Sequence, residues 1–364
     1  MAHQPGVALR SSYIRAAVLG GFAELVAGGG GDAAALVSRV GIPEQALRDP
    51  DMVISWTALG ELMELAAEEL QKPSLGLEWL LAAPEPLLNF GAIALIARFT
   101  DTVGEWCYHS RNYWHWHTNA SRAELLEDEK GDLLTLRVGF SMLVPPSRHQ
   151  AEYILGGVCA MLRTLTKEAD GGIELIRFRH ARPRDLTLHE KIFPCPIEFG
   201  SAHDELVYRR YLHEHPIELG AETLDSWLAH YVAARTGTIA DYDGSIRAHV
   251  EIAIPSLIGT NFCTQPSIAR LFSASAKTLQ RQLAREGTNF AGLLDRTRER
   301  IARRLLAESE IPVASIAGLL GYAKTPPFTA AVRRWTGVSP RTFRNRAKSV
   351  ETSLAQSDSD AAVV

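Results

Sequence analysis

Residues 264–287 read TQPSIARLFSASAKTLQRQLAREG, and this stretch decides the fold of the C-terminal part of the chain. Thr264 is a typical helix N-cap with Pro266 in the following first turn, and Gly287 is a helix terminator. The spacing therefore predicts two short helices joined by the turn SASA. Apolar residues fall where both helices can bury one shared seam: Ile268, Ala269, Phe272, Leu279 and Leu283. A second helix rich in Lys, Gln, Thr and Arg is typical of a helix-turn-helix motif.

A second pattern of the same kind lies about 50 residues further along the chain. Residues 312–337, PVASIAGLLGYAKTPPFTAAVRRWTG, predict a helix, a turn at AKT and a second helix that begins near Pro326 and Pro327. Residues 289–309, NFAGLLDRTRERIARRLLAES, predict one long helix of about 30 Å between the two patterns. That length is close to one turn of B-DNA, so the second helix of each pair could enter successive major grooves. SPRTFRNRAK predicts a final basic helix.

Charge is divided unevenly along the chain. Residues 262–349 hold 16 Lys or Arg and 5 Asp or Glu, a net charge of +11, whereas the whole chain has a net charge of −4. All 12 histidines lie before Cys263. A basic segment in an otherwise acidic chain indicates a polyanionic partner, most often nucleic acid. A helical domain with solvated Arg faces explains the charge equally well, so charge alone leaves both open.

Residues 8–225 are predicted to form an α+β domain. Leu9–Val26 has helical spacing and stops at the glycine run Gly28–Gly31, and further helices follow up to residue 82. A helix over Thr100–Thr118 precedes residues 124–140, which predict two strands around a turn, and a helix from Arg148 to Lys167 comes next. Shorter strands are expected at Ile173–Arg179, Pro196–Phe199 and Glu205–Tyr208. Interleaved helices and short strands favour a small antiparallel sheet.

Composition and motifs exclude several classes. The chain is 46% hydrophobic and 22% charged, which is typical of globular proteins. Its start lacks a signal-peptide pattern, and the apolar run Leu87–Phe99 is too short to span a bilayer. The four cysteines are widely spaced, and GxSxG, GxxxxGKS and HExxH motifs do not occur. We therefore expect a cytoplasmic protein with no cofactor, no metal, no membrane contact and no enzymatic activity.

The segment YHSRNYWHWH, residues 108–117, is the most unusual part of the acidic half. Three histidines beside two tryptophans permit a metal or haem pocket. No Cys or carboxylate stands nearby at ligand spacing, so a packed aromatic helix face that contributes to a small-molecule pocket is favoured. We expect Tyr108, Tyr113 and Trp116 to contact such a molecule.

Four segments of the basic part, KTLQRQLAREG, RERIARRLL, VASIAGLLGY and RRWTGVSPRTFR, resemble the DNA-binding domain of the AraC/XylS family of bacterial transcription regulators. The resemblance covers about residues 244–346. The acidic half is more loosely similar to the arabinose-binding type of N-terminal regulatory domain, through SLGLEWLL, NFGAIALIARFTDTVGEW and IEFGSAHDELVYRRYLHEHPIELGAETL. The resemblance implies double-stranded promoter DNA, RNA polymerase and a small-molecule effector of unknown identity as partners, and a homodimer.

The resemblance also implies which residues contact DNA. We call the second helix of each helix-turn-helix motif its reader helix. The first reader helix is expected to carry the main base contacts, and the second reader helix lies within Pro327–Trp335. The implied residues are Ala276, Lys277, Thr278, Gln280, Arg281, Arg285, Pro327, Thr329, Arg333 and Arg334. Family members commonly carry an acidic residue at the position of Lys324, an Arg at that of Ala330 and a Phe at that of Val332. Ala330 cannot donate a hydrogen bond to a base, so we expect the second helix mainly to anchor the duplex.

The sequence thus predicts an effector-sensing and dimerisation domain over residues 8–225, a linker over 226–243, a DNA-binding domain with two helix-turn-helix motifs over 244–347 and a disordered tail over 350–364. The predicted function is a sequence-specific DNA-binding transcription regulator that a small molecule controls. The alternative is a DNA-acting or small-molecule enzyme that carries a helical DNA-binding module.

Overall fold

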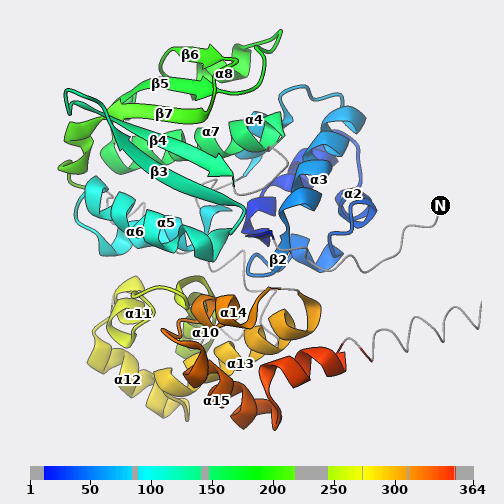
Figure 1. Cartoon of the computed structure of the whole chain (residues 1–364). Helices are drawn as coiled ribbons and strands as arrows, with labels where there is room; N and C mark the ends of the chain where they lie inside the picture. The colour runs from blue at the N-terminus through cyan, green and yellow to red at the C-terminus, as the bar shows by residue number, and fades with distance from the viewer. Residues whose placement is uncertain are drawn as a thin grey trace, which may run out of the picture. The chain divides into compact units, whose positions relative to one another are not determined.

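The computed structural model describes residues 12–83, 89–140, 147–217, 245–272, 274–309, 311–347 and 349. These residues fall into two compact units, one N-terminal up to residue 217 and one C-terminal from residue 245, and each is described by itself (Figure 1). The predicted linker over 226–243 and the predicted tail over 350–364 lie outside the described residues. Both therefore stay predictions.

The N-terminal unit is built on a five-stranded sheet. Its strands follow the order β3 (Ser121–Glu127), β4 (Leu133–Phe140), β7 (Asp204–Arg209), β5 (Ile173–Phe178) and β6 (Ile197–Phe199). Neighbours are antiparallel except β5 and β6, which are parallel. The predicted α+β class is confirmed, and β3 and β4 form the predicted hairpin. Leu134, Ile176 and Leu206 from three adjacent strands are fully buried, so the sheet has a packed apolar face.

Helix α7 (Arg148–Thr166) packs against strands β5 and β7 of this sheet. Ser147 and Gln150 form a capping box at its start, in which each side chain bonds the other residue's backbone N–H. Helices α3 (Trp56–Glu69), α4 (Leu75–Ala82) and α8 (Thr187–Ile192) pack on α7. Helices α5 (Ala92–Ile96) and α6 (Val103–His117) lie beside β3, with η4 (Ala97–Phe99) between them (Figure 1).

The start of the N-terminal unit corrects the prediction of one helix over Leu9–Val26. Within its described part, strand β1 (Tyr13–Arg15) pairs with β2 (Val53–Ser55), η1 (Ala16–Leu19) follows, and α1 (Phe22–Gly28) begins only after Gly21. Gly21 has φ of +79°, and a Cβ there would lie 2.6 Å from the backbone nitrogen of Ala83. Only glycine fits this turn, and the long-range partner strand overrides the local helical spacing. Helix α2 (Ala33–Arg39) and η2 (Glu44–Leu47) complete this region.

The named elements of the C-terminal unit are all helices in its described residues. Helix α10 (Ile246–Leu257) precedes the pair α11 (Gln265–Leu271) and α12 (Ala276–Arg285). Helix α13 (Phe290–Glu308) leads to the pair α14 (Val313–Leu319) and α15 (Thr325–Thr336), and residues 340–347 are helical again. Helices α14 and α15 both contact α13, whereas α11 and α12 contact each other and α10 (Figure 1). The predicted pair of helix-turn-helix motifs is confirmed.

Each helix pair closes over its own small core. Ile268 of α11 and Leu279 and Leu283 of α12 are fully buried, as the apolar seam predicts. Ile316 of α14 and Phe328 of α15 are fully buried in the second pair. Burial of these side chains fixes which face of each second helix stays exposed. No helix in the described parts of either unit is both long and apolar enough to cross a bilayer.

Candidate nucleic-acid interface and ligand pocket

Helix α12 is held rigidly by contacts at its start. Ser275 caps the helix by accepting a hydrogen bond of 3.1 Å from the backbone N–H of Thr278. The amide of Gln265 on α11 donates a 2.9 Å hydrogen bond to the carbonyl oxygen of Ala276. These contacts set the angle between the two helices of the motif, so the direction of the exposed face of α12 is defined.

The end of α12 is tied to α10, the first helix of the unit. The Glu286 carboxylate accepts hydrogen bonds from the backbone N–H groups of Ile246 and Arg247, at 3.3 and 2.9 Å. These are N–H groups of the first turn of α10, where a negative charge also interacts favourably with the helix dipole. Both ends of the reader helix are therefore fixed by hydrogen bonds to other elements.

The exposed face of α12 carries the polar residues that the sequence places there. Lys277, Gln280, Arg281 and Arg285 are exposed, whereas Ala276 and Thr278 are partly buried. None of the three cationic side chains is ion-paired with another described residue. A row of unpaired donors on one face of a short fixed helix can reach base edges in a major groove.

Helix α15 begins in a different way. Its N-cap position is Lys324, whose side chain makes no capping hydrogen bond, and Pro326 and Pro327 follow in the first turn. A capping side chain accepts from the second or third N–H of a helix, and at those positions both residues are prolines that have no N–H. The prolines therefore remove the two donors that a cap would satisfy, which explains why Lys is tolerated there.

The exposed face of α15 is poor in hydrogen-bond donors. Pro327, Ala330, Arg333 and Arg334 are exposed, and Thr329 is partly buried. The guanidinium of Arg334 is ion-paired with Asp295 of α13. Arg333 makes no ion pair with a described residue. Of the predicted DNA contacts on α15, it is therefore the cation without an ion pair among the described residues.

Asp295 joins α13 to the end of α15 through a second contact. Besides Arg334, its carboxylate accepts a 3.1 Å hydrogen bond from the indole N–H of Trp335. The Arg334 guanidinium also lies over the Trp335 ring, 5.6 Å from its centroid. This cluster gives Arg334 a structural contact that the sequence pattern does not reveal, because its partner is 39 residues away.

Several other arginines of the basic segment bind backbone carbonyls. Arg298 donates a 2.8 Å hydrogen bond to the carbonyl oxygen of Leu320 at the end of α14, and its guanidinium lies 4.7 Å from the centroid of the Tyr322 ring. Arg303 and Arg344 donate to the carbonyl oxygens of Trp335 and Ile311, each at 2.6 Å. The net charge of +11 thus includes cations that stabilise the fold, which counting residues cannot distinguish from cations free to bind DNA.

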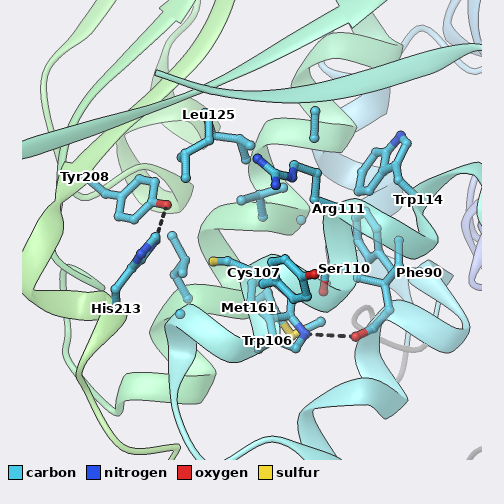
Figure 2. A pocket seen from close by; sticks show the side chains of 18 residues that line it. Phe90, Trp106, Cys107, Ser110, Arg111, Trp114, Leu125, Met161, Tyr208 and His213 are labelled. Carbon is cyan, nitrogen blue, oxygen red and sulfur yellow. Dashed lines mark hydrogen bonds between the residues drawn. The ribbon is translucent and has the colours of Figure 1, made fainter. Parts of the chain in front are cut away.

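A pocket of about 250 Å³ lies in the N-terminal unit between α6, α7 and strands β3, β4 and β7. Figure 2 shows Tyr208 and His213 at one side and Trp114 at the other, with Arg111 extending between them towards Leu125. Most of the wall is apolar and includes Phe90, Ile93, Trp106, Leu136, Met161 and Leu162. Such walls with a few polar groups are typical of small-molecule sites.

One wall of the pocket depends on a glycine in α7. A Cβ at Gly157 would lie 2.0 Å from Cζ of the Phe90 ring. The absence of a side chain therefore lets Phe90 lie directly on α7 and form part of the wall. The ring also stacks near Tyr153, with 6.2 Å between the centroids, so its position is fixed from both sides.

Burial disfavours the charged forms of Cys107 and His213 in the wall. Burial raises the pKa of the Cys107 thiol to about 12. Burial and the nearby charge of Arg210 lower the pKa of His213, whose Nε2 lies 3.0 Å from the Tyr208 hydroxyl. The indole N–H of Trp106 is used in a 2.9 Å hydrogen bond to the carbonyl oxygen of Ile93. Among the described lining residues, Arg111 is the one with a charged side chain.

The structure places the three predicted effector residues differently. Tyr108 lines the pocket and is 58% exposed. Tyr113 is not among the lining residues, and its ring stacks on His109 with 6.2 Å between the centroids. The side chain of Trp116 lies outside the described residues. The sequence reasoning missed Ser110 and Arg111, although a single Arg within an aromatic helix is a signal that could have found the latter.

Of the histidines of the same helix, the side chains of His109 and His117 are described, and neither belongs to a metal site among the described residues. His117 is buried, and burial together with Arg15 lowers its pKa to about 3. Nowhere in the described parts do three or more His, Cys, Asp or Glu residues form a group that could hold a metal ion. His117 is therefore a neutral residue of the core.

Comparison with known proteins adds two matches. Residues 30–217, just over half of the chain, match the family described as the arabinose-binding domain of AraC transcription regulators, N-terminal. Residues 268–346 match a family described as a helix-turn-helix domain. The chain belongs to the AraC family of transcription regulators. The suspected resemblance of both halves is thereby confirmed.

Similar proteins include further regulators. The AraC-family chain is 26% identical over 340 residues to the HTH-type transcriptional regulator VirS of Mycobacterium tuberculosis, covering 92% of this chain and 96% of VirS. It is 36% identical over 102 residues to the regulator VqsM of Pseudomonas aeruginosa, covering 28% and 31% of the two chains. The crystal structure of the transcriptional regulator CdpR from Pseudomonas aeruginosa matches 80% of this chain and 95% of that one, with 22% identity and a TM-score of 0.34.

Proposed function

We propose that this AraC-family chain recognises a specific promoter sequence through α12, anchors the duplex with α15, and is controlled by a small molecule that binds the pocket of the N-terminal unit. The observation that carries the proposal is the contrast between the exposed faces of the two reader helices. Helix α12 exposes three cations, Lys277, Arg281 and Arg285, that make no ion pair with a described residue, whereas α15 exposes two prolines and Ala330 beside Arg333, which also makes no ion pair with a described residue.

The side chains on α12 suit direct reading of bases. Arg281 and Lys277 can donate to the O6 and N7 atoms of guanine, and Gln280 can pair with adenine through its amide. Rigid attachment of the helix supports this role, because base contacts require side chains placed within a fraction of an ångström.

The side chains on α15 suit phosphate contacts instead. Arg333 is exposed and can bind a phosphate oxygen at any sequence. Ala330 offers only a methyl group to a base edge. The two prolines also reduce the number of backbone N–H groups that the start of α15 can offer to a phosphate. Anchoring by α15 therefore depends on the Arg333 side chain.

Control by a ligand requires that the ligand bind two states of the chain unequally. We propose a homodimer whose DNA affinity, or whose contact with RNA polymerase, changes when the pocket is filled. Regulators with paired reader modules commonly bind paired half-sites, and a dimer supplies such an arrangement.

We further propose that the N-terminal unit binds its ligand without transforming it. Burial raises the pKa of Cys107 and Cys159 in this unit to about 12 and that of Cys195 to about 11, and it raises the pKa of Cys263 in the C-terminal unit to about 12. A DNA-acting or small-molecule enzyme that uses a cysteine nucleophile needs the opposite shift. Recovery of a bound ligand unchanged after prolonged incubation with the full chain tests this proposal.

Salt dependence of DNA binding tests the interface. Each neutralised phosphate contributes a slope of about −0.9 to log K against log[salt]. We expect the full chain to bind a promoter duplex with a steep negative slope, measured by fluorescence anisotropy between 50 and 300 mM salt, roughly the range in which such slopes are resolved. An affinity that does not change with salt would contradict the proposal.

Oligomeric state is tested separately. Sedimentation of the full chain at tens of micromolar, roughly the concentration at which stable homodimers persist, should show a dimer. A monomer under these conditions would contradict the dimer part of the proposal and leave DNA recognition by α12 untouched.

A further inference from the structure

The chemistry of the pocket wall restricts the ligand that it can bind. Apolar side chains from α5, α6, α7 and three strands surround most of the volume of about 250 Å³. Examples are Trp106, Leu136, Met161 and Leu162. The side chain of Trp106 is 6% exposed and that of Leu162 is 2% exposed. A sugar carries hydroxyl groups on every side and would leave most of them without partners here, at a high cost in desolvation. The wall instead fits a molecule with an apolar body.

Charge in the pocket has one sign. Arg111 is exposed and makes no ion pair with any described residue, and its side chain extends across the pocket (Figure 2). None of the described lining residues is Asp or Glu. A cationic ligand would meet an uncompensated arginine, whereas an anionic group would gain charge-assisted hydrogen bonds from the guanidinium.

A buried hydroxyl lies one residue before this arginine on the same helix, and Figure 2 shows the two side chains in different parts of the pocket. Ser110 lines the pocket and is 6% exposed, and its Oγ has no hydrogen-bond partner among the described residues. A buried polar group without a partner destabilises the free protein, so it commonly marks a place where something else binds. Ser110 and Arg111 provide an uncharged and a charged donor in the apolar wall.

We propose that the pocket binds a small molecule with an apolar body and one carboxylate, in which Arg111 binds the carboxylate and the aromatic and aliphatic wall, with Ser110 in it, holds the body. This inference rests on the proposed ligand control and names the chemical class of the ligand. Tyr108 and Arg111 are the exposed lining residues of α6, so the carboxylate lies towards solvent and the apolar body lies deeper.

Matched probes test the chemistry on the full chain. Octanoate and 4-phenylbutanoate supply a carboxylate, octan-1-ol and octylamine keep the apolar body with a neutral or cationic end, and L-arabinose supplies a sugar. Binding is measured by calorimetry and by quenching of tryptophan fluorescence, because Trp106 and Trp114 line the pocket. We expect the carboxylates to bind at least tenfold more tightly than the alcohol, which is roughly the contribution of a hydrogen bond to a charged group. The amine and arabinose should not bind measurably.

Variants assign the binding to these residues. Arg111→Gln should weaken octanoate binding roughly tenfold or more and leave octan-1-ol unaffected. Arg122→Gln, at an arginine of β3 that is also exposed and does not line the pocket, is the matched control. Ala123→Phe should fill the pocket and abolish binding of every probe, and Glu124→Phe, at the next position of the strand, should not.

Ser110→Ala separates the carboxylate site from the rest of the wall. It should leave octanoate affinity unchanged, because Ser110 lies apart from the Arg111 guanidinium, while the Tm of the free chain stays the same or rises, because a buried hydroxyl without a partner among the described residues is removed. A loss of octanoate affinity as large as that of Arg111→Gln would contradict the assignment of the carboxylate to Arg111.

Two results would overturn the proposal as a whole. One is tighter binding of octylamine or arabinose than of octanoate, and the other is octanoate binding that Arg111→Gln or Ala123→Phe leaves unchanged. Either result leaves the proposed DNA recognition intact, because DNA affinity is measured on the same preparations without a probe. Loss of salt-dependent DNA binding would contradict the proposed function and not the ligand class.

Discussion

Helices α12 and α15 hold equivalent places in two helix pairs that share one linking helix, yet their exposed faces differ. Helix α12 has a side-chain cap, hydrogen bonds to neighbours at both ends and unpaired donors outside. Helix α15 has two prolines in its first turn, an arginine paired with Asp295 and an alanine at the centre of its exposed face. The same fold therefore carries two different sets of possible contacts with DNA.

The difference shows that a helix can keep the helix-turn-helix fold without carrying the side chains that recognise bases. Burial of Leu279 and Leu283 in one motif and of Phe328 and Val332 in the other preserves both folds. The exposed residues, which the core does not constrain, decide what each helix can bind. The following changes test this separation.

The largest effect on binding is expected for Arg281→Ala. Loss of a guanidinium that contacts a base should cost about 1–3 kcal/mol on the cognate site and relax the preference at one base pair. Anisotropy titrations on the cognate duplex and on duplexes with single base-pair changes measure both quantities. Arg300→Ala, an exposed arginine of α13, is the matched control for loss of one charge. Equal losses for the two variants would break the assignment of base reading to α12.

Arg298→Ala should destabilise the second helix pair. The variant loses the hydrogen bond to the carbonyl oxygen of Leu320 and the contact with the Tyr322 ring, and we expect the free energy of unfolding to fall by about 1–2 kcal/mol. Urea denaturation of the full chain, monitored with Arg300→Ala beside it, measures the change. Unchanged stability would show that the carbonyl contact is not needed to position α14 and α15.

Ser275→Ala and Lys324→Ala compare the two helix starts directly. Removing the Ser275 cap should cost about 1 kcal/mol, because the N–H of Thr278 loses its acceptor. Lys324→Ala should change the stability by less than about 0.5 kcal/mol, since the prolines have no N–H to satisfy. Thermal unfolding checks both values, and a similar cost at the two positions would contradict our explanation of the uncapped start.

Arg333→Ala is expected to have the smallest effect on binding. Loss of one phosphate contact should weaken cognate and unrelated duplexes equally, roughly threefold to fivefold at moderate salt, and should reduce the salt slope by about one unit. Titrations of both duplexes at several salt concentrations measure this change. A selective loss on the cognate duplex would indicate that α15 also reads bases.

The sequence predicted those features that depend on neighbours along the chain. The cap at Thr264, the buried seam and the β3–β4 hairpin all follow from spacings of a few residues. The break at Gly21 did not follow, because it depends on a strand pairing with residues 53–55 and on the backbone of Ala83. Local periodicity contains no information about such partners.

The candidate sites were predictable to different degrees. Residues on the exposed face of α12 follow from helical periodicity once the buried seam is known. The pocket brings together α6, α7 and three strands, so the places of Ser110 and Arg111 in it become visible only in the folded unit. The carbonyl partners of Arg298 and Arg303 were also hidden, because a backbone carbonyl has no signature in the sequence.

Selection of binding sites from a randomised duplex library tests the central claim most directly. The wild-type full chain, Arg281→Ala and Arg333→Ala are each used to select sites at the same salt concentration. We predict that Arg333→Ala selects the wild-type motif, whereas Arg281→Ala selects a motif that is degenerate at one position or more. A changed motif for Arg333→Ala together with an unchanged motif for Arg281→Ala would contradict the division of roles between α12 and α15.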